Sequence, residues 1–163
     1  MRATERTRKS AAAVIAVLAM AAAGCGGSVS HGRESPDAVE KKARSLAQQT
    51  LDAVRGAADV ASTSVARNAW LSCPEETPGQ HRYEYVYTLN VGVPQSRTEA
   101  ALAAAKAHFK KLGYTVDPPE EGRAGATLPN SNWTVALGVK DDSTIVIQAD
   151  TDCVSTSHSP QTT

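Results

Sequence analysis

The sequence predicts an α+β fold: a mainly antiparallel sheet of about four strands, two helices packed on one face of that sheet, and one disulfide. Two segments carry apolar residues at intervals of three and four, which is typical of amphipathic helices. Residues 82–93 and 133–149 instead alternate apolar and polar positions, which is typical of half-buried strands. The order of these elements is helix, strand, helix, strand and hairpin, an arrangement that favours helices on one face of an antiparallel sheet.

The first helix is expected to begin at Ser35-Pro36-Asp37, where serine suits the N-cap, proline the first turn and aspartate the helix dipole. Its apolar stripe comprises Val39, Ala43, Leu46, Thr50, Val54 and Ala57. We interpret this stripe as a face packed on the sheet, with a partner-binding surface as the alternative. Gly56 and the polar run 62–64 weaken the helical pattern beyond about residue 60.

The second helix follows Pro94 and opens with Ser96-Arg97-Thr98-Glu99, a match to the capping box. It is expected to run to about Leu112 and to stop at Gly113. A short strand at 114–116 comes next. Residues 117–130 contain several prolines and glycines and are expected to form a long, mobile irregular stretch.

Three tyrosines, Tyr83, Tyr85 and Tyr87, share one face of the clearest strand. We interpret this face as core or cross-strand packing. The alternative is a possible ligand face, with the tyrosines lining a groove for a sugar, ring or lipid and the 117–130 stretch acting as a lid. A second long strand at 133–139 and its return at 144–149 are joined by the polar turn 140–143, which predicts a hairpin.

Three cysteines divide into one near the N-terminus and a distant pair, Cys73 and Cys153. An even pair of cysteines predicts a disulfide when the domain is exported, and the N-terminal segment described next indicates export. A disulfide that closes a loop of this length stabilises the folded state by roughly 4–5 kcal/mol in the chain-entropy model. A redox-active dithiol is the alternative, although such pairs usually have the Cys-x-x-Cys spacing.

The N-terminus has a basic segment, an apolar run from Ala11 to Ala23, and Cys25 directly after Ala22-Ala23-Gly24. These are the parts of a secretory signal with a small-residue cleavage site. The segment resembles the lipobox of bacterial lipoprotein precursors, although Ala22 stands where leucine is common. That resemblance implies cleavage before Cys25, lipidation of its thiol, and a location on the extracytoplasmic face of the cell membrane. The alternatives are release as a soluble protein after Ala23 and an uncleaved membrane anchor, for which the run is short.

The expected organisation is a signal peptide at 1–24, a flexible Gly/Ser-rich tether at 25–35, a single domain at 36–154 and a disordered tail at 155–163. The whole chain has 17 basic and 17 acidic residues. Four of the basic residues and one of the acidic residues lie in the signal, which leaves a mature net charge of −3. A clustered basic face is missing from the mature sequence, so we expect no nucleic-acid partner.

Sequence motifs for catalysis, metal binding or cofactor binding are missing as well. The four histidines have no metal-ligand spacing, and neither a nucleophile elbow nor a phosphate loop occurs. We therefore expect no metal, cofactor or catalytic residue. The alanine-rich signal and helices, Trp70-x-x-Cys73, the Leu112-Gly113-Tyr114 helix end and the late cysteine make the chain similar to small lipoproteins of actinobacterial type, many of them uncharacterised. That resemblance does not identify any catalytic residue in this chain.

The function expected from these features is that of a non-enzymatic binding or accessory module of the cell envelope, lipid-anchored and monomeric, with a protein or wall component as its partner. The alternatives are a small-ligand or lipid carrier that uses the tyrosine face, and a small hydrolase. A carrier requires an enclosed apolar pocket of several hundred Å³. A hydrolase requires polar groups that converge in a cleft.

Overall fold

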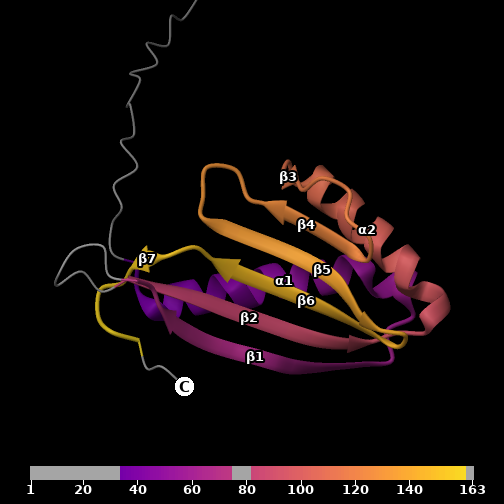
Figure 1. Cartoon of the computed structure of the whole chain (residues 1–163), viewed down its shortest axis with the longest axis horizontal. Coiled ribbons are helices and arrows are strands. Elements are labelled where there is room, and N and C mark those ends of the chain that lie inside the picture. Colours follow the sequence, from indigo (N-terminus) through magenta and orange to yellow (C-terminus); the bar gives the residue numbers. More distant parts are fainter. Residues whose placement is uncertain (1–33, 75–81, 161–163) are drawn as a thin grey trace, which may run out of the picture. The chain divides into compact units, whose positions relative to one another are not determined.

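The computed structural model describes residues 34–74 and 82–160. The signal peptide, Cys25 and all but the last two residues of the tether lie outside this range, so lipidation remains a prediction. The described chain runs through two α-helices, one short 3-10 helix (η1) and seven strands. The predicted α+β class is confirmed, and Figure 1 shows the sheet with its helices.

Helix α1 (Pro36–Ala58) begins where the sequence predicts. The Ser35 hydroxyl accepts a hydrogen bond from the Ala38 amide at 3.2 Å, which satisfies one of the free donors of the first turn. Its apolar stripe is buried as the spacing predicts, except that Ala57 is only half-buried and the neighbouring Ala58 is buried instead. The buried residues are Pro36, Val39, Ala43, Leu46, Ala47, Thr50, Leu51, Val54 and Ala58.

Helix α2 (Thr98–Lys111) begins differently from the prediction. A turn of 3-10 helix, η1 (Gln95–Arg97), precedes it, and the N-cap residue Arg97 makes no side-chain capping bond. The capping-box prediction is therefore wrong: Ser96 lies inside the 3-10 turn, and the Thr98 hydroxyl instead donates to the Gln95 carbonyl at 2.9 Å. The predicted stop is confirmed by Gly113, whose φ of +73° is a left-handed conformation that glycine adopts without strain.

All seven strands belong to one antiparallel sheet, in which six follow the order β1-β2-β6-β5-β4-β3 and β7 pairs with β2. The strands are β1 (Ser62–Ser72), β2 (Arg82–Gly92), β3 (Thr115–Val116), β4 (Arg123–Thr127), β5 (Trp133–Asp141), β6 (Thr144–Thr151) and β7 (Val154–Ser155). The predicted strand at 82–93, the short strand at 114–116 and the 133–149 hairpin are confirmed. The expected number of about four strands is too low.

Two of the additional strands have no apolar alternation. Residues 62–68 of β1 are exposed on both faces of the strand, so no period of two appears in the sequence. Strand β4 lies inside the stretch predicted to be irregular, and its buried residues are the small Ala124, Gly125 and Ala126. Its pairing with β5 from Arg123 to Thr127 means that 117–130 is not one continuous loop.

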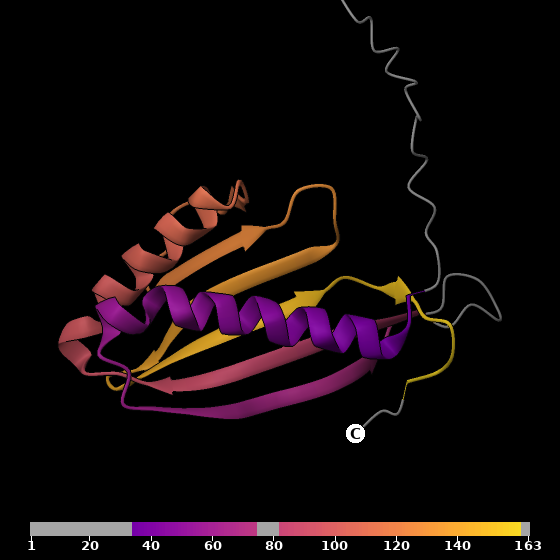
Figure 2. The ribbon, with the colours of Figure 1, turned by 180° about the vertical axis from the view of Figure 1, so that it is seen from behind.

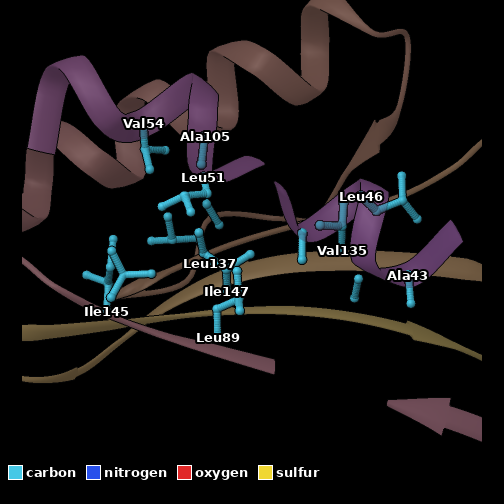
Figure 3. Close-up of a cluster of buried hydrophobic side chains, with 14 of the residues drawn as sticks. Ala43, Leu46, Leu51, Val54, Leu89, Ala105, Val135, Leu137, Ile145 and Ile147 are labelled. Atoms are coloured by element: carbon cyan, nitrogen blue, oxygen red, sulfur yellow. The ribbon is translucent and has the colours of Figure 1, made fainter. Parts of the chain in front are cut away.

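Both helices lie on the same side of the sheet, as Figure 1 and its reverse view in Figure 2 show. Helix α1 packs on β2 and β6, and α2 packs on α1, β3, β4 and β5. Between these layers lies one continuous core of buried apolar side chains, part of which Figure 3 shows. Its central residues from the sheet are Leu89, Val91, Val135, Leu137, Ile145 and Ile147.

The predicted disulfide is confirmed: Cys73 and Cys153 are bonded, with Cα atoms 6.1 Å apart. At the same end of the sheet, the chain entering α1 pairs with the chain leaving β7. Glu34 forms a parallel bridge with Thr156, and the Ser157 amide donates to the Glu34 carbonyl at 3.0 Å. Thr156 is 6 % exposed, so the chain stays packed on the domain beyond residue 154, where the sequence places the start of a disordered tail.

Candidate binding face of the sheet

The tyrosines that the sequence singles out lie on the helix side of β2. Tyr83 and Tyr85 are buried and pack against Trp70 of β1, with ring centroids 6.3 Å and 4.8 Å from the Trp70 ring. Tyr87 is half-buried, and the Arg44 guanidinium lies 6.0 Å from its ring centroid. This face is therefore part of the core, and the interpretation of the three tyrosines as a ligand face loses its support.

Polar side chains form hydrogen bonds at the edge of this tyrosine face. The Trp70 indole Nε1 donates to Glu40 Oε1 at 3.1 Å, and Arg44 bonds the other Glu40 oxygen at 3.1 Å. The Tyr85 hydroxyl donates to the Asn68 side-chain oxygen. Burial raises the pKa of Tyr85, and the neighbouring Glu40 carboxylate raises it further. These groups attach the first half of α1 to β1 and β2.

The opposite side of the sheet, here called the open face, points away from both helices (Figure 1). Its side chains come from the strand positions between the core residues, and most of them are small or polar. The strand register places them in rows across the sheet. The central row reads Arg67, Thr88, Gln148, Ala136 and Gly125, and the row beside it reads Ala69, Val86, Asp150, Thr134 and Thr127.

A depression of about 400 Å³, open to solvent, lies on the open face over β4, β5 and β6. Its floor is low because the outward positions in the middle of the sheet carry Ala136 and Gly138, while larger polar side chains surround them. The lining residues are Asp117, Arg123, Ala126, Thr127, Thr134, Val135, Ala136, Gly138, Val146, Gln148 and Asp150.

Gly125 is needed at the β4 side of the depression. A Cβ atom at this position would collide with Asp117 Oδ2 and would lie 3.6 Å from the Arg123 guanidinium. Glycine therefore lets the Asp117 carboxylate lie over the strand, beside Arg123. The Asp117 amide also donates to the Gly125 carbonyl at 2.9 Å, which fixes the backbone below this carboxylate.

Asp150 lies on β6 at the other side of the depression and is held by two neutral donors. The Thr134 hydroxyl donates to its Oδ2 at 2.6 Å, and the Gln148 amide nitrogen donates to its Oδ1 at 2.9 Å. Both donors come from the open face, Thr134 on β5 and Gln148 on β6 itself. The Asp150 carboxylate is therefore half-buried and fixed in orientation.

The charges at the depression are only partly neutralised. Arg123 forms an ion pair with Glu120 at 3.2 Å. Within residues 34–74 and 82–160, neither Asp117 nor Asp150 has a cation within ion-pairing distance. Together with Glu120, the lining therefore carries three carboxylates and one guanidinium.

A second hollow, of about 320 Å³, lies along α1 between Asp37, Glu40, Lys41 and Arg44. All four residues come from successive turns of the same helix. Because Glu40 already bonds Trp70 and Arg44, this hollow belongs to the contact between α1 and the sheet.

The described residues hold no group of three or more His, Cys, Asp or Glu side chains arranged to bind a metal ion. Of the four histidines, His31 and His81 lie outside these residues. His108 lies on α2, where burial and the nearby Lys111 lower its pKa. His158 follows β7, and its ring Nδ1 is 3.1 Å from the Ser157 hydroxyl oxygen.

Sequence reasoning missed the depression because its residues come from four separate segments that only the register brings together. The sequence feature that points to the depression is on β5, where the small outward residues Ala136 and Gly138 alternate with large inward residues such as Val135 and Leu137. Small outward residues on a central strand leave room above the sheet. No aromatic side chain is among the lining residues.

No helix within the described ranges is both long and apolar enough to span a bilayer. Comparison of the chain with protein-family models, with curated proteins and with solved structures gave no match.

Proposed function

We propose that this protein is a lipid-anchored, non-enzymatic binding module of the cell envelope, and that it binds a polar partner through the open face of its sheet. The observation that carries this proposal is the depression on that face, with a low floor of Ala136 and Gly138 and fixed polar groups around it. A sheet that packs helices on one side and leaves small, polar side chains on the other offers a preformed surface. Binding to such a surface requires little ordering of side chains.

The anchored location rests on the N-terminal sequence. Cys25 directly follows a segment with the sequence features of a secretory signal, and the other two cysteines are bonded to each other. Nine chain steps separate Cys25 from Glu34, and a flexible Gly/Ser-rich tether of that length would span roughly 15–18 Å. The open face would therefore meet its partner close to the membrane.

The carrier alternative has less support. It needs an enclosed apolar pocket, and the face on which it was based is occupied by the core between β2 and α1. The depression on the other face is open, and charged side chains, Asp117, Arg123 and Asp150, line it together with small apolar residues. A polar partner suits this lining better than an acyl chain does.

Crosslinking in intact cells tests the proposal. Ala136→Trp places a large side chain on the floor of the depression, and Ala107→Trp adds the same bulk to an exposed position of α2. We expect the wild type and Ala107→Trp to yield the same crosslinked partner and Ala136→Trp to lose it. Intact-mass spectrometry of the recovered protein should show a chain that starts at Cys25 and carries lipid.

Two results would contradict the proposal: no crosslinked partner for the wild type, or an equal yield from Ala136→Trp. Thermal unfolding of the purified variants checks that each one folds. If Ala136→Trp does not fold, Ala136→Gln fills part of the same space with a smaller side chain and takes its place.

A further inference from the structure

The depression has a carboxylate whose position is fixed but whose charge is not balanced. Thr134 and Gln148 each donate one hydrogen bond to Asp150, at 2.6 Å and 2.9 Å, so each carboxylate oxygen keeps a further lone pair as acceptor. Both donors are neutral. A half-buried carboxylate that is held by neutral donors gains free energy from a cation placed beside it.

Asp117 supplies a second carboxylate on the β4 side of the same depression. Its oxygen lies over Gly125, in the space that a Cβ atom would fill. The neighbouring Arg123 is already paired with Glu120 at 3.2 Å. The local charge of the lining therefore stays negative, and it complements a positively charged ligand group.

The space between the two carboxylates suits a long, narrow cationic side chain. Its floor, Ala136 and Gly138, offers only small side chains, and Val146 adds an apolar contact for methylene groups. Lysine and arginine pack their stems on such surfaces while their charged ends stay near polar groups. The Thr134 hydroxyl and the Gln148 amide add neutral hydrogen-bonding groups beside Asp150.

We propose that this depression binds a lysine or arginine side chain of a partner polypeptide, with Asp150 as the main anionic contact and Asp117 as the second. The inference rests on the proposed function and names the chemistry that the partner presents. Two other basic residues of the open face lie outside the depression. Arg82 bonds the Cys153 carbonyl at 3.0 Å, and Arg67 is on the edge strand β1.

The test uses the mature, disulfide-bonded, lipid-anchored protein in detergent micelles and follows backbone amide signals by NMR. The probe is the blocked tripeptide acetyl-Gly-Lys-Gly-amide, and its control is the same peptide with norleucine in place of lysine, which keeps the stem and removes the charge. We expect the lysine peptide to shift the signals of Gly138, Gln148 and Asp150 and the norleucine peptide to leave them in place.

Asp150→Asn keeps the shape of the side chain and removes its charge. We expect it to weaken binding of the lysine peptide about tenfold, the usual loss for one charged hydrogen bond. Asp142→Asn makes the same change of charge in the exposed hairpin turn and should leave binding unaltered. If Asp150→Asn does not fold, Asp117→Asn provides the same measurement at the second carboxylate.

The inference is overturned if the norleucine peptide shifts the same signals, if Asp150→Asn binds the lysine peptide as tightly as the wild type, or if calcium chloride alone reproduces the shifts. Its failure can be told apart from failure of the proposed function. If Ala136→Trp abolishes capture of the partner in cells while Asp150→Asn preserves it, the open face binds a partner of a different chemistry.

Discussion

The two faces of the sheet have opposite compositions, although they are built from the same strands. On β6, Ile145, Ile147 and Ala149 are fully buried beneath the helices, while Val146, Gln148 and Asp150 alternate with them on the open face. The aromatic contacts also gather on the helix side, where Trp70 packs against Tyr83 and Tyr85. The helix side thus supplies the apolar burial that stabilises the fold. The open face is left free to carry polar side chains.

The largest effect is expected from a comparison of two neighbouring residues on β6, one on each face of the sheet. Ile147→Ala removes a fully buried side chain from the core and should lower the free energy of unfolding by about 2–5 kcal/mol. Val146→Ala removes a half-exposed side chain from the open face and should cost less than about 1 kcal/mol. Urea unfolding of both variants provides the measurement. Equal losses would mean that both faces contribute to one shared core.

A smaller effect is expected from the ionisation of Tyr85. Burial raises its pKa in the folded protein above that in the unfolded chain. The stability that this pKa difference provides is therefore fully present below about pH 10, the pKa of tyrosine in the unfolded chain. It is lost as the pH rises through the raised pKa of the folded protein. Urea midpoints between pH 9 and pH 11 should fall less steeply for Tyr85→Phe than for the wild type. Identical slopes of urea midpoint against pH for the two proteins would show that the folded protein accommodates the charged Tyr85 phenolate.

The smallest change in stability is expected at Gly125 on the open face. The Cβ atom in Gly125→Ala displaces the Asp117 carboxylate, which is the far end of a flexible side chain. We expect the free energy of unfolding to change by less than about 1 kcal/mol. The same variant should bind the lysine peptide more weakly, because Asp117 no longer lies over the strand. A large loss of stability with unchanged binding would assign Asp117 to the fold and remove it from the site.

The division between the faces also explains which parts of the fold were predictable from the sequence. Strand β2 and the β5–β6 hairpin were recognised because large apolar residues alternate with others along them, as at Val135 and Leu137. Helix α1 was recognised from its buried stripe and its Ser35 cap. In each case the signal came from the residues that make the core.

Elements that add little to the core left no such signal. At the edge of the sheet, residues 62–68 of β1 are exposed on both faces, with Val65 56 % exposed, so the extended conformation of this part of the strand depends on backbone pairing with β2. Strand β4 buries only Ala124, Gly125 and Ala126. The candidate site was hidden for the same reason: it is made of small and polar residues whose proximity depends on strand register.

The Cys73–Cys153 bond has a mechanical consequence for a protein held at its N-terminal end. Glu34 enters the domain beside the disulfide, and 80 residue positions separate the two bonded cysteines. If force unravels the domain between residues 34 and 160, the covalently closed loop adds no length, and the chain extends to about 150–165 Å. With the bond reduced, the same segment reaches about 415–455 Å. The disulfide thus limits how far residue 160 can be drawn from the point of attachment when the sheet unfolds under force.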